Sequence, residues 1–421
     1  MQPKGLRSRV LSIVAVLVGL MAVGGGAAGA AGDSKGPIRI GFIAPLTGPF
    51  SGPGKDMQVG FTMYLEEIGY KAGERPIELV VEDDEGKPQA SLTKVRKMVE
   101  MDGVHMLAGN LLTNAEYALI HLLESLRTPM VFPQLRADDI ALRKPSRWAM
   151  STGANLSLPS HPFGEYAFKV LGYRKIVNVA LDYAFGYEVS GGFQKTFEDA
   201  GGQIVQKIWI PISALDMAPY IAQIRRDADA VFGTFSGRSA VQFIRQYKEA
   251  GLKEKIPLIG TGIMTDEILL HTMGDEALDL VTSTFYSATL DYPANQRHAR
   301  TVRAKLGRAP SSFTAGSYTA ARWLLEAARL VQWNVEDRTG LAAALRKVEI
   351  PDDPRGPIKL DADGSPIINV YVRRVERVRG ELQNTLIRTY PAVSKFWTYD
   401  PETFRKQPLY SRDFPPCRHC R

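Results

Sequence analysis

The stretch Ile38-Arg-Ile-Gly-Phe-Ile-Ala-Pro-Leu-Thr-Gly-Pro-Phe-Ser-Gly-Pro-Gly54 decides the fold. It begins as a buried strand, with apolar side chains at Ile38, Ile40 and Phe42, and it ends in a loop rich in Gly, Pro and Thr. Open α/β folds bind their ligands at the carboxyl edge of the sheet. We therefore expect this first loop to lie beside a binding site.

The chain begins with the pattern of an export signal. Lys4, Arg7 and Arg9 form a basic start, the range 10–23 is apolar, and Ala28-Gly29-Ala30 has the small residues that a signal peptidase cleaves after. The apolar run is too short to span a bilayer. We expect residues 1–30 to be removed as a signal peptide and the mature protein to be soluble in the periplasm.

Composition excludes several classes of protein. The formal net charge of +7 is concentrated in the export signal and in the segment after Val393, so the body of the chain is nearly neutral and nucleic acid is not an expected partner. Both cysteines, Cys417 and Cys420, lie at the end of the chain, so no disulfide staples the body. The length predicts two domains that are stable from their own cores.

Short β-rich runs alternate with helical patterns along most of the chain. Ile38–Ala44 and Met130–Phe132 are examples of the strands, and Lys55–Ile68 has apolar residues at helical spacing. This alternation predicts βαβ units, an α/β fold with two doubly wound parallel-sheet lobes, and three hinge crossings between them. The predicted parts are lobe 1 at 37–152 and 288–364, lobe 2 at 153–287 and 365–391, and a C-terminal extension at 392–421. Asp361-Ala-Asp-Gly364 predicts a hairpin turn.

Several motifs, in order and at matching spacing from Ile38 to about Tyr390, resemble one family. They include Gly41-Phe-Ile-Ala-Pro-Leu-Thr-Gly48, Val81-Glu-Asp-Asp84, Gly109 with Thr113, Phe185-Gly186 and Asp229-Ala-Val-Phe-Gly233. The family is that of the periplasmic substrate-binding proteins of branched-chain-amino-acid-type (Leu/Ile/Val-binding-like) ABC importers. The resemblance implies the type I periplasmic binding fold, capture of a small molecule by hinge closure, and delivery to an inner-membrane permease.

The resemblance places the ligand carboxylate beside a hydroxyl residue at a helix start, and Thr113 occupies this position. A helix N-terminus offers free N–H donors to an anion, although Thr113 could equally be a plain N-cap. A second loop of the family corresponds to Gln134 and Arg136, where amino-acid binders have small residues. Arg136 could pair with a ligand carboxylate, or with Asp138 or Asp139 on the surface.

The ammonium side departs from the family pattern. Amino-acid binders carry a carboxylate where this chain has Gly262, so nothing there balances a buried ammonium. The family's ligand-enclosing aromatic positions match Phe185, Phe235 and Phe313, and Pro53 stands in the first loop. Each Phe alone fits a core residue equally well, but as a set they predict an apolar, π-faced binding site.

An anion end without an ammonium end predicts an organic acid as the ligand, with an aromatic carboxylate as the best fit. A branched-chain amino acid or amide is the alternative, if Asp182, Asp291 or Glu188 supplies the missing charge. A periplasmic sensor module would have the same fold. Motifs of phosphate-binding loops, serine hydrolases and zinc proteases are absent from the sequence, so we expect neither an enzyme nor a bound cofactor or metal.

The last thirty or so residues fall outside the family pattern. Six of them are aromatic between Phe396 and Phe414, which is too apolar for a solvated tail, so we expect this segment to pack along a lobe. It ends in Cys417-Arg-His-Cys420, which could form a local disulfide, bind a metal with His419 or act in redox exchange. The local disulfide is the favoured interpretation. We expect a monomer, because monomers suit docking on a permease.

Overall fold

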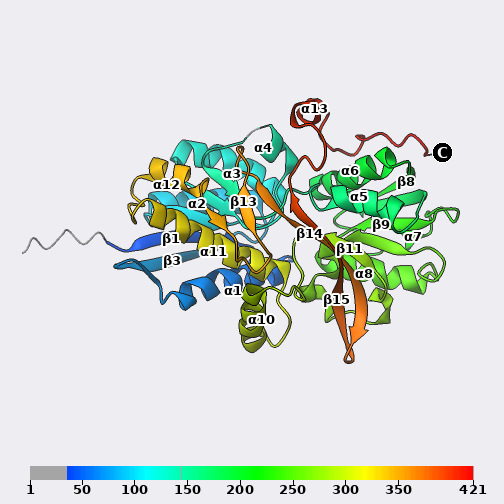
Figure 1. The fold of residues 1–421 in the computed structure, drawn as a ribbon, viewed down its shortest axis with the longest axis horizontal. Coiled ribbons are helices and arrows are strands. Elements are labelled where there is room, and N and C mark those ends of the chain that lie inside the picture. The colour runs from blue at the N-terminus through cyan, green and yellow to red at the C-terminus, as the bar shows by residue number, and fades with distance from the viewer. Residues whose placement is uncertain (1–35, 144, 421) are drawn as a thin grey trace, which may run out of the picture. The chain divides into compact units, whose positions relative to one another are not determined.

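Two β-sheets covered by helices organise the chain (Figure 1), in a computed structural model that describes residues 36–143 and 145–420. This confirms the predicted α/β class with two parallel-dominated sheets. The export signal predicted for residues 1–30 lies outside the described residues. Across the described ranges, every helix is either too short or too polar to cross a membrane.

The first sheet has six strands in the described part of the chain, in the order β2-β3-β1-β4-β5-β6. All neighbours are parallel except β2 and β3, which form a short antiparallel pair. The central strand β1 has the predicted bounds, Ile38–Ala44. The others are β2 (Lys71–Ala72), β3 (Arg75–Asp83), β4 (Met106–Gly109), β5 (Met130–Phe132) and β6 (Ala149–Ser151).

Helices cover both faces of this sheet because successive strand residues point to opposite sides. In β1, Ile40 and Phe42 enter one core together with α1 and α11, while Ile43 enters a second core with α2 and α3. We call this sheet and its helices the first lobe. Its helices are α1 (Ser51–Glu67), α2 (Pro88–Glu100), α3 (Thr113–Leu126), α4 (Asp138–Leu142), α10 (Pro293–Leu306), α11 (Ser312–Leu330) and α12 (Arg338–Leu345).

The second sheet follows the same plan. In the described residues its strand order is β12-β13-β14-β11-β10-β9-β7-β8, and β15 pairs with β14. The strands β7 to β11 are parallel, and β14 adds to them antiparallel through β11. Their bounds are β7 (Lys175–Leu181), β8 (Gln203–Ile210), β9 (Ala230–Thr234), β10 (Leu258–Thr261), β11 (Val281–Thr284), β12 (Glu349–Ile350), β13 (Ile358–Leu360), β14 (Pro366–Val378) and β15 (Glu381–Val393).

Alternating side chains of these strands again pack into two different cores, one on each face of the sheet. Val177 and Val179 of β7 face a core shared with α8, and Ile176 faces a core shared with α5 and α6. We call the strands β7 to β11 with these helices the second lobe. Its helices are α5 (Ser160–Lys169), α6 (Ala184–Asp199), α7 (Ala218–Ile221), α8 (Gly237–Glu249) and α9 (Glu267–Leu270), with short 3₁₀ turns η1 (Gly262–Thr265) and η2 (Asp275–Ala277).

The long strand β14 contributes to both lobes. Its first residues pair with β13, and Ile368 and Val370 belong to the core of the first lobe. Further along, Tyr371 to Arg374 pair with β11 of the second lobe. The predicted turn before β14 is confirmed, since the Gly364 N–H donates to the Asp361 carbonyl oxygen at 3.0 Å.

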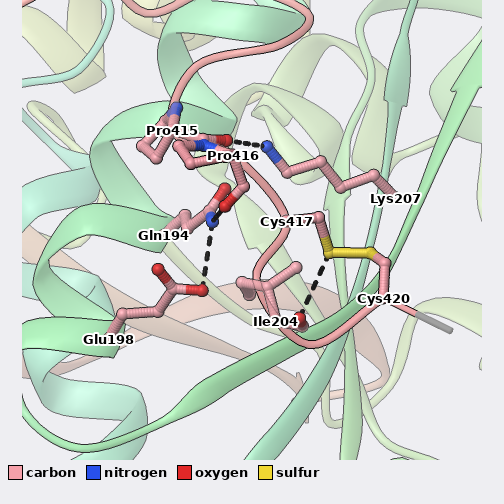
Figure 2. Close-up of a disulfide and its surroundings, with 8 residues drawn as sticks. All are labelled: Gln194, Glu198, Ile204, Lys207, Pro415, Pro416, Cys417 and Cys420. Carbon is pink, nitrogen blue, oxygen red and sulfur yellow. Dashed lines mark hydrogen bonds between the residues drawn. A yellow bond between two sulfur atoms is a disulfide. The ribbon is translucent and has the colours of Figure 1, made fainter.

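The C-terminal extension begins after β15 and contains α13 (Pro401–Lys406). Figure 2 shows its end, where Cys417 and Cys420 are joined in a disulfide beside β8. The Gln194 side chain donates to the Pro416 carbonyl oxygen at 3.0 Å, and Lys207 donates to that of Pro415. The extension is therefore fixed along its length instead of hanging free.

One contact of the extension makes stability sensitive to pH. His161 of α5 is fully buried, its Nε2 atom lies 3.0 Å from the Tyr410 hydroxyl, and burial lowers the pKa of this histidine to about 3. In the unfolded chain the pKa of a histidine is about 6.5. The unfolded state therefore binds more protons below pH 6.5, and the folded state loses stability as the pH falls.

We predict that lowering the pH from 7 to 5 costs about 2 kcal/mol of unfolding free energy through His161 alone. Urea unfolding of wild type and His161→Gln at both pH values measures this, and the loss should be smaller by that amount in the variant. His121→Gln, at an exposed position on α3, is the matched control. Equal losses in wild type and His161→Gln would contradict the prediction.

Candidate functional site

A cavity lies where the carboxyl ends of strands from both lobes meet. It encloses about 680 Å³, part of it open to solvent. Both sheets deliver their strand-to-helix loops to it, which is where open α/β folds bind ligands. Its wall consists of Phe50, Pro53, Leu111, Leu112, Thr113, Gln134, Leu135, Leu156, Tyr183, Phe185, Ser236, Gly237, Ile263, Ile268, Leu269 and Phe313.

The cavity wall contains the first turns of five helices. Pro53, Thr113, Phe185, Gly237 and Phe313 lie in the first turns of α1, α3, α6, α8 and α11. The first N–H groups of a helix have no acceptor within the helix, and its N-terminus carries a partial positive charge. Five such termini around one space make it favourable for negative charge.

Four of these five helices begin without a side-chain cap. The N-cap residues of α1, α3, α6 and α8 accept no hydrogen bond through their side chains from the first turns of these helices. By contrast, the Ser311 side chain caps α11. Helix starts in folded proteins usually find such a partner. The Ser51 N–H of α1 donates to the Gly48 carbonyl oxygen at 3.2 Å and the Ala115 N–H of α3 to the Asn114 side chain at 3.0 Å, so the donors available to a bound group are the other N–H groups of these first turns.

The wall is otherwise apolar and uncharged. Phe50, Phe185 and Phe313 supply aromatic surface and Leu and Ile side chains supply most of the rest, and no lining residue in the described ranges carries a formal charge. An ammonium group brought into this space would lack a counter-ion, and burying an unpaired charge is costly. The cavity therefore suits an apolar body with an acceptor-rich end.

Tyr183 and Ser236 provide side-chain polarity on the second-lobe wall. Each follows a strand of that lobe and stands at the start of a helix, α6 or α8. Burial raises the pKa of Tyr183 to about 12, against the opposing effect of its hydrogen bond to Ser236. The phenol is therefore neutral at ordinary pH and can donate a hydrogen bond to a ligand.

A glycine sets the entry into α3. Gly109, at the end of β4, has a φ of 113°, and a Cβ there would lie 2.0 Å from the Ile43 carbonyl oxygen of β1. No side chain fits at that distance. The close approach allows the chain to turn at Asn110 and to bring Leu111, Leu112 and Thr113 to the cavity.

Of the eight ligand residues predicted from the sequence, the structure brings five together in this wall. These are Pro53, Thr113, Gln134, Phe185 and Phe313. The Gln134 side-chain amide donates to the Phe313 carbonyl oxygen at 3.4 Å, which joins two parts of the wall. Their part in binding a ligand stays a prediction.

Arg136 does not face the cavity, and the expectation that it does is wrong. Its side chain is 1% exposed, and its Nε donates to Glu116 of α3 at 2.9 Å. The alternative, a surface pair with Asp138 or Asp139, is also wrong, because the partner is buried Glu116. Leu135, the preceding residue, lines the cavity instead.

Phe235 and Gly262 also lie outside the cavity wall. Phe235 is buried in the second-lobe core, where its ring stacks on Phe243 with centroids 4.2 Å apart. A Cβ at Gly262 would lie 2.5 Å from the Thr284 Cβ, so a longer side chain has no room there. Their neighbours Ser236 and Ile263 line the cavity.

None of the three acids considered as an ammonium partner lines the cavity in the described structure. Asp182 accepts from the Tyr187 hydroxyl at 2.6 Å, and Asp291 accepts from Gln296 at 2.7 Å. Glu188 is buried in α6 and accepts from the Asp138 N–H at 2.7 Å. Each carboxylate is engaged elsewhere in the protein.

Behind the wall lies a buried acidic cluster made of Glu116, Asp138 and Glu188, with Arg136 beside it. Glu116 also accepts from the Ala137 N–H at 3.1 Å, which fixes the loop after β5 to α3. Burial raises the pKa of Glu116 to about 7, although the Arg136 guanidinium acts in the opposite direction. Burial likewise raises the pKa of Asp138 and of Glu188. These carboxyl groups hold loops in place and lie outside the cavity wall.

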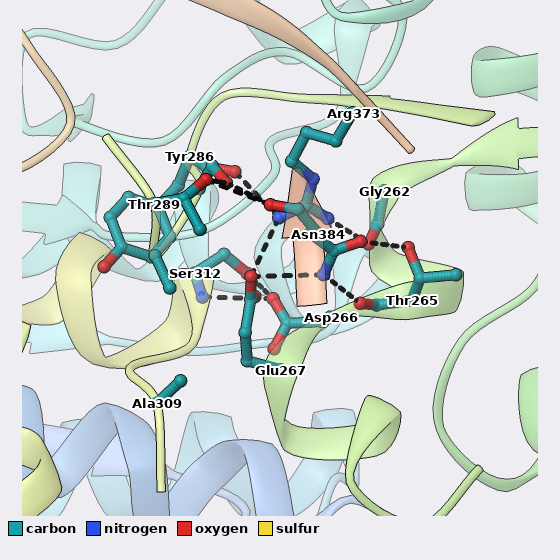
Figure 3. A network of polar contacts seen from close by, with 12 residues as sticks. Gly262, Thr265, Asp266, Glu267, Tyr286, Thr289, Ala309, Ser312, Arg373 and Asn384 are labelled. Carbon is teal, nitrogen blue, oxygen red and sulfur yellow. Dashed lines mark hydrogen bonds and ion pairs between the residues drawn. The ribbon is translucent and has the colours of Figure 1, made fainter. Parts of the chain in front are cut away.

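Figure 3 shows a second network of polar contacts, made largely by buried side chains. Asp266, immediately before α9, accepts from the N–H and hydroxyl of Ser312 at 3.0 and 2.6 Å. Ser312 begins α11 of the first lobe, so this carboxylate connects the two lobes next to Ile268 and Phe313. Arg373 of β14 donates to the carbonyl oxygens of Gly262 and Tyr286 and so fixes the loop that carries Ile263.

Sequence reasoning missed most of the apolar wall, as well as Tyr183 and Ser236. Ser236 directly follows Phe235, and Tyr183 stands two residues before Phe185, so the neighbours of the predicted aromatic residues were a usable signal. Leu111, Ile263 and Ile268 carry no signal of their own, because an isolated Leu or Ile is usually a core residue. In the described ranges, no group of three or more His, Cys, Asp or Glu side chains is arranged to hold a metal ion.

Comparisons with known proteins agree with this architecture. A profile of the family described as periplasmic binding protein matches residues 37–381. A Leu/Ile/Val-binding protein homolog 6 from Brucella melitensis is 29% identical over 366 residues, which cover 84% of this chain and 91% of the relative.

Two solved structures are similar over most of their length. An ABC transporter substrate-binding protein from Sphaerobacter thermophilus is 33% identical with a TM-score of 0.80, and the match covers 85% of this chain and 98% of that one. A solute-binding protein of an ABC transporter from Rhodopseudomonas palustris BisB5, in complex with 3,4-dihydroxybenzoic acid, is 29% identical with the same TM-score and coverage.

We predict that Arg136→Met lowers the unfolding free energy by about 3–5 kcal/mol, because it leaves Glu116 buried without its cation. The double variant Glu116→Gln/Arg136→Met should recover much of this loss, since no isolated charge remains. Urea unfolding measures both, with exposed Arg147→Met as the matched control. A double variant that is less stable than Arg136→Met would contradict the pairing.

Proposed function

The chain belongs to the periplasmic binding protein family, as a substrate-binding protein of the ABC transporter type, and we propose that its ligand is a small aromatic carboxylate. On this proposal the protein is exported and its signal peptide is removed. The mature protein captures the acid in the periplasm and delivers it to an inner-membrane permease. The lobe and extension boundaries predicted from the sequence are part of the same proposal.

The observation that carries the proposal is the set of four uncapped helix starts at an uncharged cavity. Backbone N–H groups at helix N-termini bind carboxylates without a cationic side chain, through hydrogen bonds and the helix dipole. The absence of a carboxylate from the described wall disfavours an ammonium group on the same ligand.

The apolar surface argues for the rest of the ligand. Phe50, Phe185 and Phe313 offer ring faces and edges, and aromatic pairs contribute roughly 0.5–1.5 kcal/mol beyond the area they bury. Neutral Tyr183 offers a hydrogen bond to a ring substituent or to the carboxylate. The relative from Rhodopseudomonas palustris, which is in complex with 3,4-dihydroxybenzoic acid, supports this class of ligand.

A branched-chain amino acid is the second candidate, supported by the name of the Leu/Ile/Val-binding homolog. The same uncapped helices would receive its α-carboxylate. Its ammonium group would then have only neutral acceptors, such as the Gln134 and Ser236 side chains. This cost places the amino acid behind an acid without an amine.

Binding on this proposal involves closure of the two lobes. The wall includes Thr113 and Phe313 from the first lobe and Phe185 and Ser236 from the second, so a ligand touches both at once. Only a ligand that gains contacts in the closed arrangement can shift the equilibrium towards it. The Asp266–Ser312 hydrogen bonds add a direct contact between the lobes in this arrangement.

We predict that aromatic acids stabilise the ligand-stripped, refolded mature protein against heat. At a hundredfold excess over the dissociation constant, a ligand adds about 2.7 kcal/mol, which raises Tm by several degrees. The panel consists of benzoate, 4-hydroxybenzoate, 3,4-dihydroxybenzoate, phenylacetate, benzamide and leucine. Benzamide matches benzoate in shape without its charge, so it should give no shift. A shift with leucine alone would favour the second candidate over the proposal.

Ser236 offers a matched test of charge at the site. Asp and Asn both suit the N-cap of α8 and are nearly isosteric, so both variants should fold. We predict that Ser236→Asp weakens binding of an aromatic carboxylate by tenfold or more through like-charge repulsion, whereas Ser236→Asn changes it only a few fold. Calorimetric titration measures both. Equal effects of the two substitutions would argue against a carboxylate near α8.

A further inference from the structure

The C-terminal extension contacts both lobes and has no role in the function proposed above. The matches to the two solved relatives cover 98% of each relative but only 85% of this chain. This chain therefore has residues that are not part of the shared fold. Within it, Ser394–Cys420 follows β15 and alternates between partners in the first and second lobes. We call this segment the strap.

The first-lobe anchor of the strap is Lys395, whose side chain is 1% exposed. Its Nζ donates to Asp363 at 2.7 Å and to the Ala141 carbonyl oxygen of α4 at 3.1 Å. Asp361 lies 3.1 Å away, so two carboxylates of the β13–β14 turn surround one ammonium. A buried ammonium needs such compensation. Arg405 of α13 pairs with the same Asp363, and Arg143 donates to the Gln407 carbonyl oxygen, so the strap has further contacts with the first lobe.

The second-lobe anchor is Tyr410, with its hydroxyl against His161 of α5 and its ring against α6. A Cβ at Gly191 would lie 2.6 Å from the Tyr410 ring, so α6 has a glycine where the strap crosses it. The Tyr399 hydroxyl donates to Asp199 at the end of the same helix at 2.6 Å. Beyond Tyr410, the disulfide-bonded end lies against β8 (Figure 2).

The strap is linked to the cavity through α6. This helix begins at the wall with Phe185, and the strap holds it at Gly191, Gln194 and Asp199. A rotation that separates the lobes at the cavity has to move α6 relative to α4 and the β13–β14 turn. Such a rotation breaks either the Lys395 or the Tyr410 contacts.

We infer that the strap holds the two lobes in the arrangement that encloses the cavity, and so raises the affinity of the site. This inference rests on the proposed function for its ligand, but not for the restraint itself. When only a fraction of the protein is binding-competent, the apparent dissociation constant is the intrinsic one divided by that fraction. A strap that enlarges the closed fraction tightens binding without touching the ligand.

The test uses the mature chain with Lys395→Met, with Tyr410→Ala and with both. In ligand-free protein, hydrogen exchange of the Ser312 amide reports opening, because this N–H donates across the lobes to Asp266. Calorimetry with 3,4-dihydroxybenzoate measures affinity. Tyr247→Ala, which removes another buried tyrosine, in the second-lobe core, is the control for lost stability. Tyr410→Phe replaces Tyr410→Ala if the latter does not fold.

We predict about tenfold faster exchange at Ser312 and about tenfold weaker binding in each single variant. The double variant should show less than the product of the two single effects, because both substitutions loosen one restraint, part of which the Arg405–Asp363 and Tyr399–Asp199 contacts retain. Tyr247→Ala should lower Tm but leave exchange at Ser312 unchanged. Two outcomes would overturn the proposal that the strap restrains the lobes: effects that multiply in the double variant, or unchanged exchange in the single variants. Failure of wild type to bind 3,4-dihydroxybenzoate would count against the proposed ligand. The exchange data would still show whether the strap restrains the two lobes.

Discussion

The constraint on which the site depends is the common direction of the parallel strands. Each strand is followed by a helix, so every strand ends at one edge of its sheet and every helix begins there. Where two such edges face each other, many helix N-termini lie around one space. Their N–H groups and partial positive charges need partners. Because α1, α3, α6 and α8 have no side-chain cap, that need can be met by a ligand.

The ionisable side chains around this space hold the scaffold together. Arg136 is paired with Glu116, Glu188 holds the Asp138 backbone, and Arg373 holds two loop carbonyl groups. Each of these groups is buried, where a pair or a hydrogen bond is required. The loops that form the wall are thereby fixed, and the wall itself can remain neutral. On the proposed function, selectivity for a carboxylate then depends mainly on backbone N–H groups.

The fold could be predicted from the sequence because its signals are local. Ile38–Ala44 and Met130–Phe132 were predicted with the bounds that the structure has. Helix α5 was not predicted, since Pro159, Pro162 and Gly164 are typical of a loop. It forms through tertiary packing: a Cβ at Gly164 would lie 2.2 Å from the Thr196 hydroxyl of α6, so the two helices approach closely at this glycine.

The cavity wall could be predicted in part, since five of the eight predicted residues line it and the other three miss it by one residue. Arg136, Phe235 and Gly262 each lie directly beside a residue that does line the cavity, namely Leu135, Ser236 and Ile263. At the end of a strand, neighbouring side chains point to opposite faces. A motif therefore identifies the loop, but the side that each residue takes depends on the packing of the following helix. Arg136 and Phe235 found better partners in the core, and Gly262 has no room for a side chain.

A neutral site also explains why a restraint between the lobes would matter here. Hydrogen bonds from backbone amides and contacts with apolar rings contribute modestly, and association must offset the entropy of ordering both partners. A protein without an ion pair to its ligand gains comparatively more from being preorganised. Lys395 and Tyr410 lie outside the cavity wall. Lys395 forms a buried ion pair and Tyr410 contacts a buried histidine, and the cavity wall contains neither kind of contact. On the two proposals together, charged and buried contacts of the strap fix the arrangement of the lobes, and the neutral cavity selects the ligand.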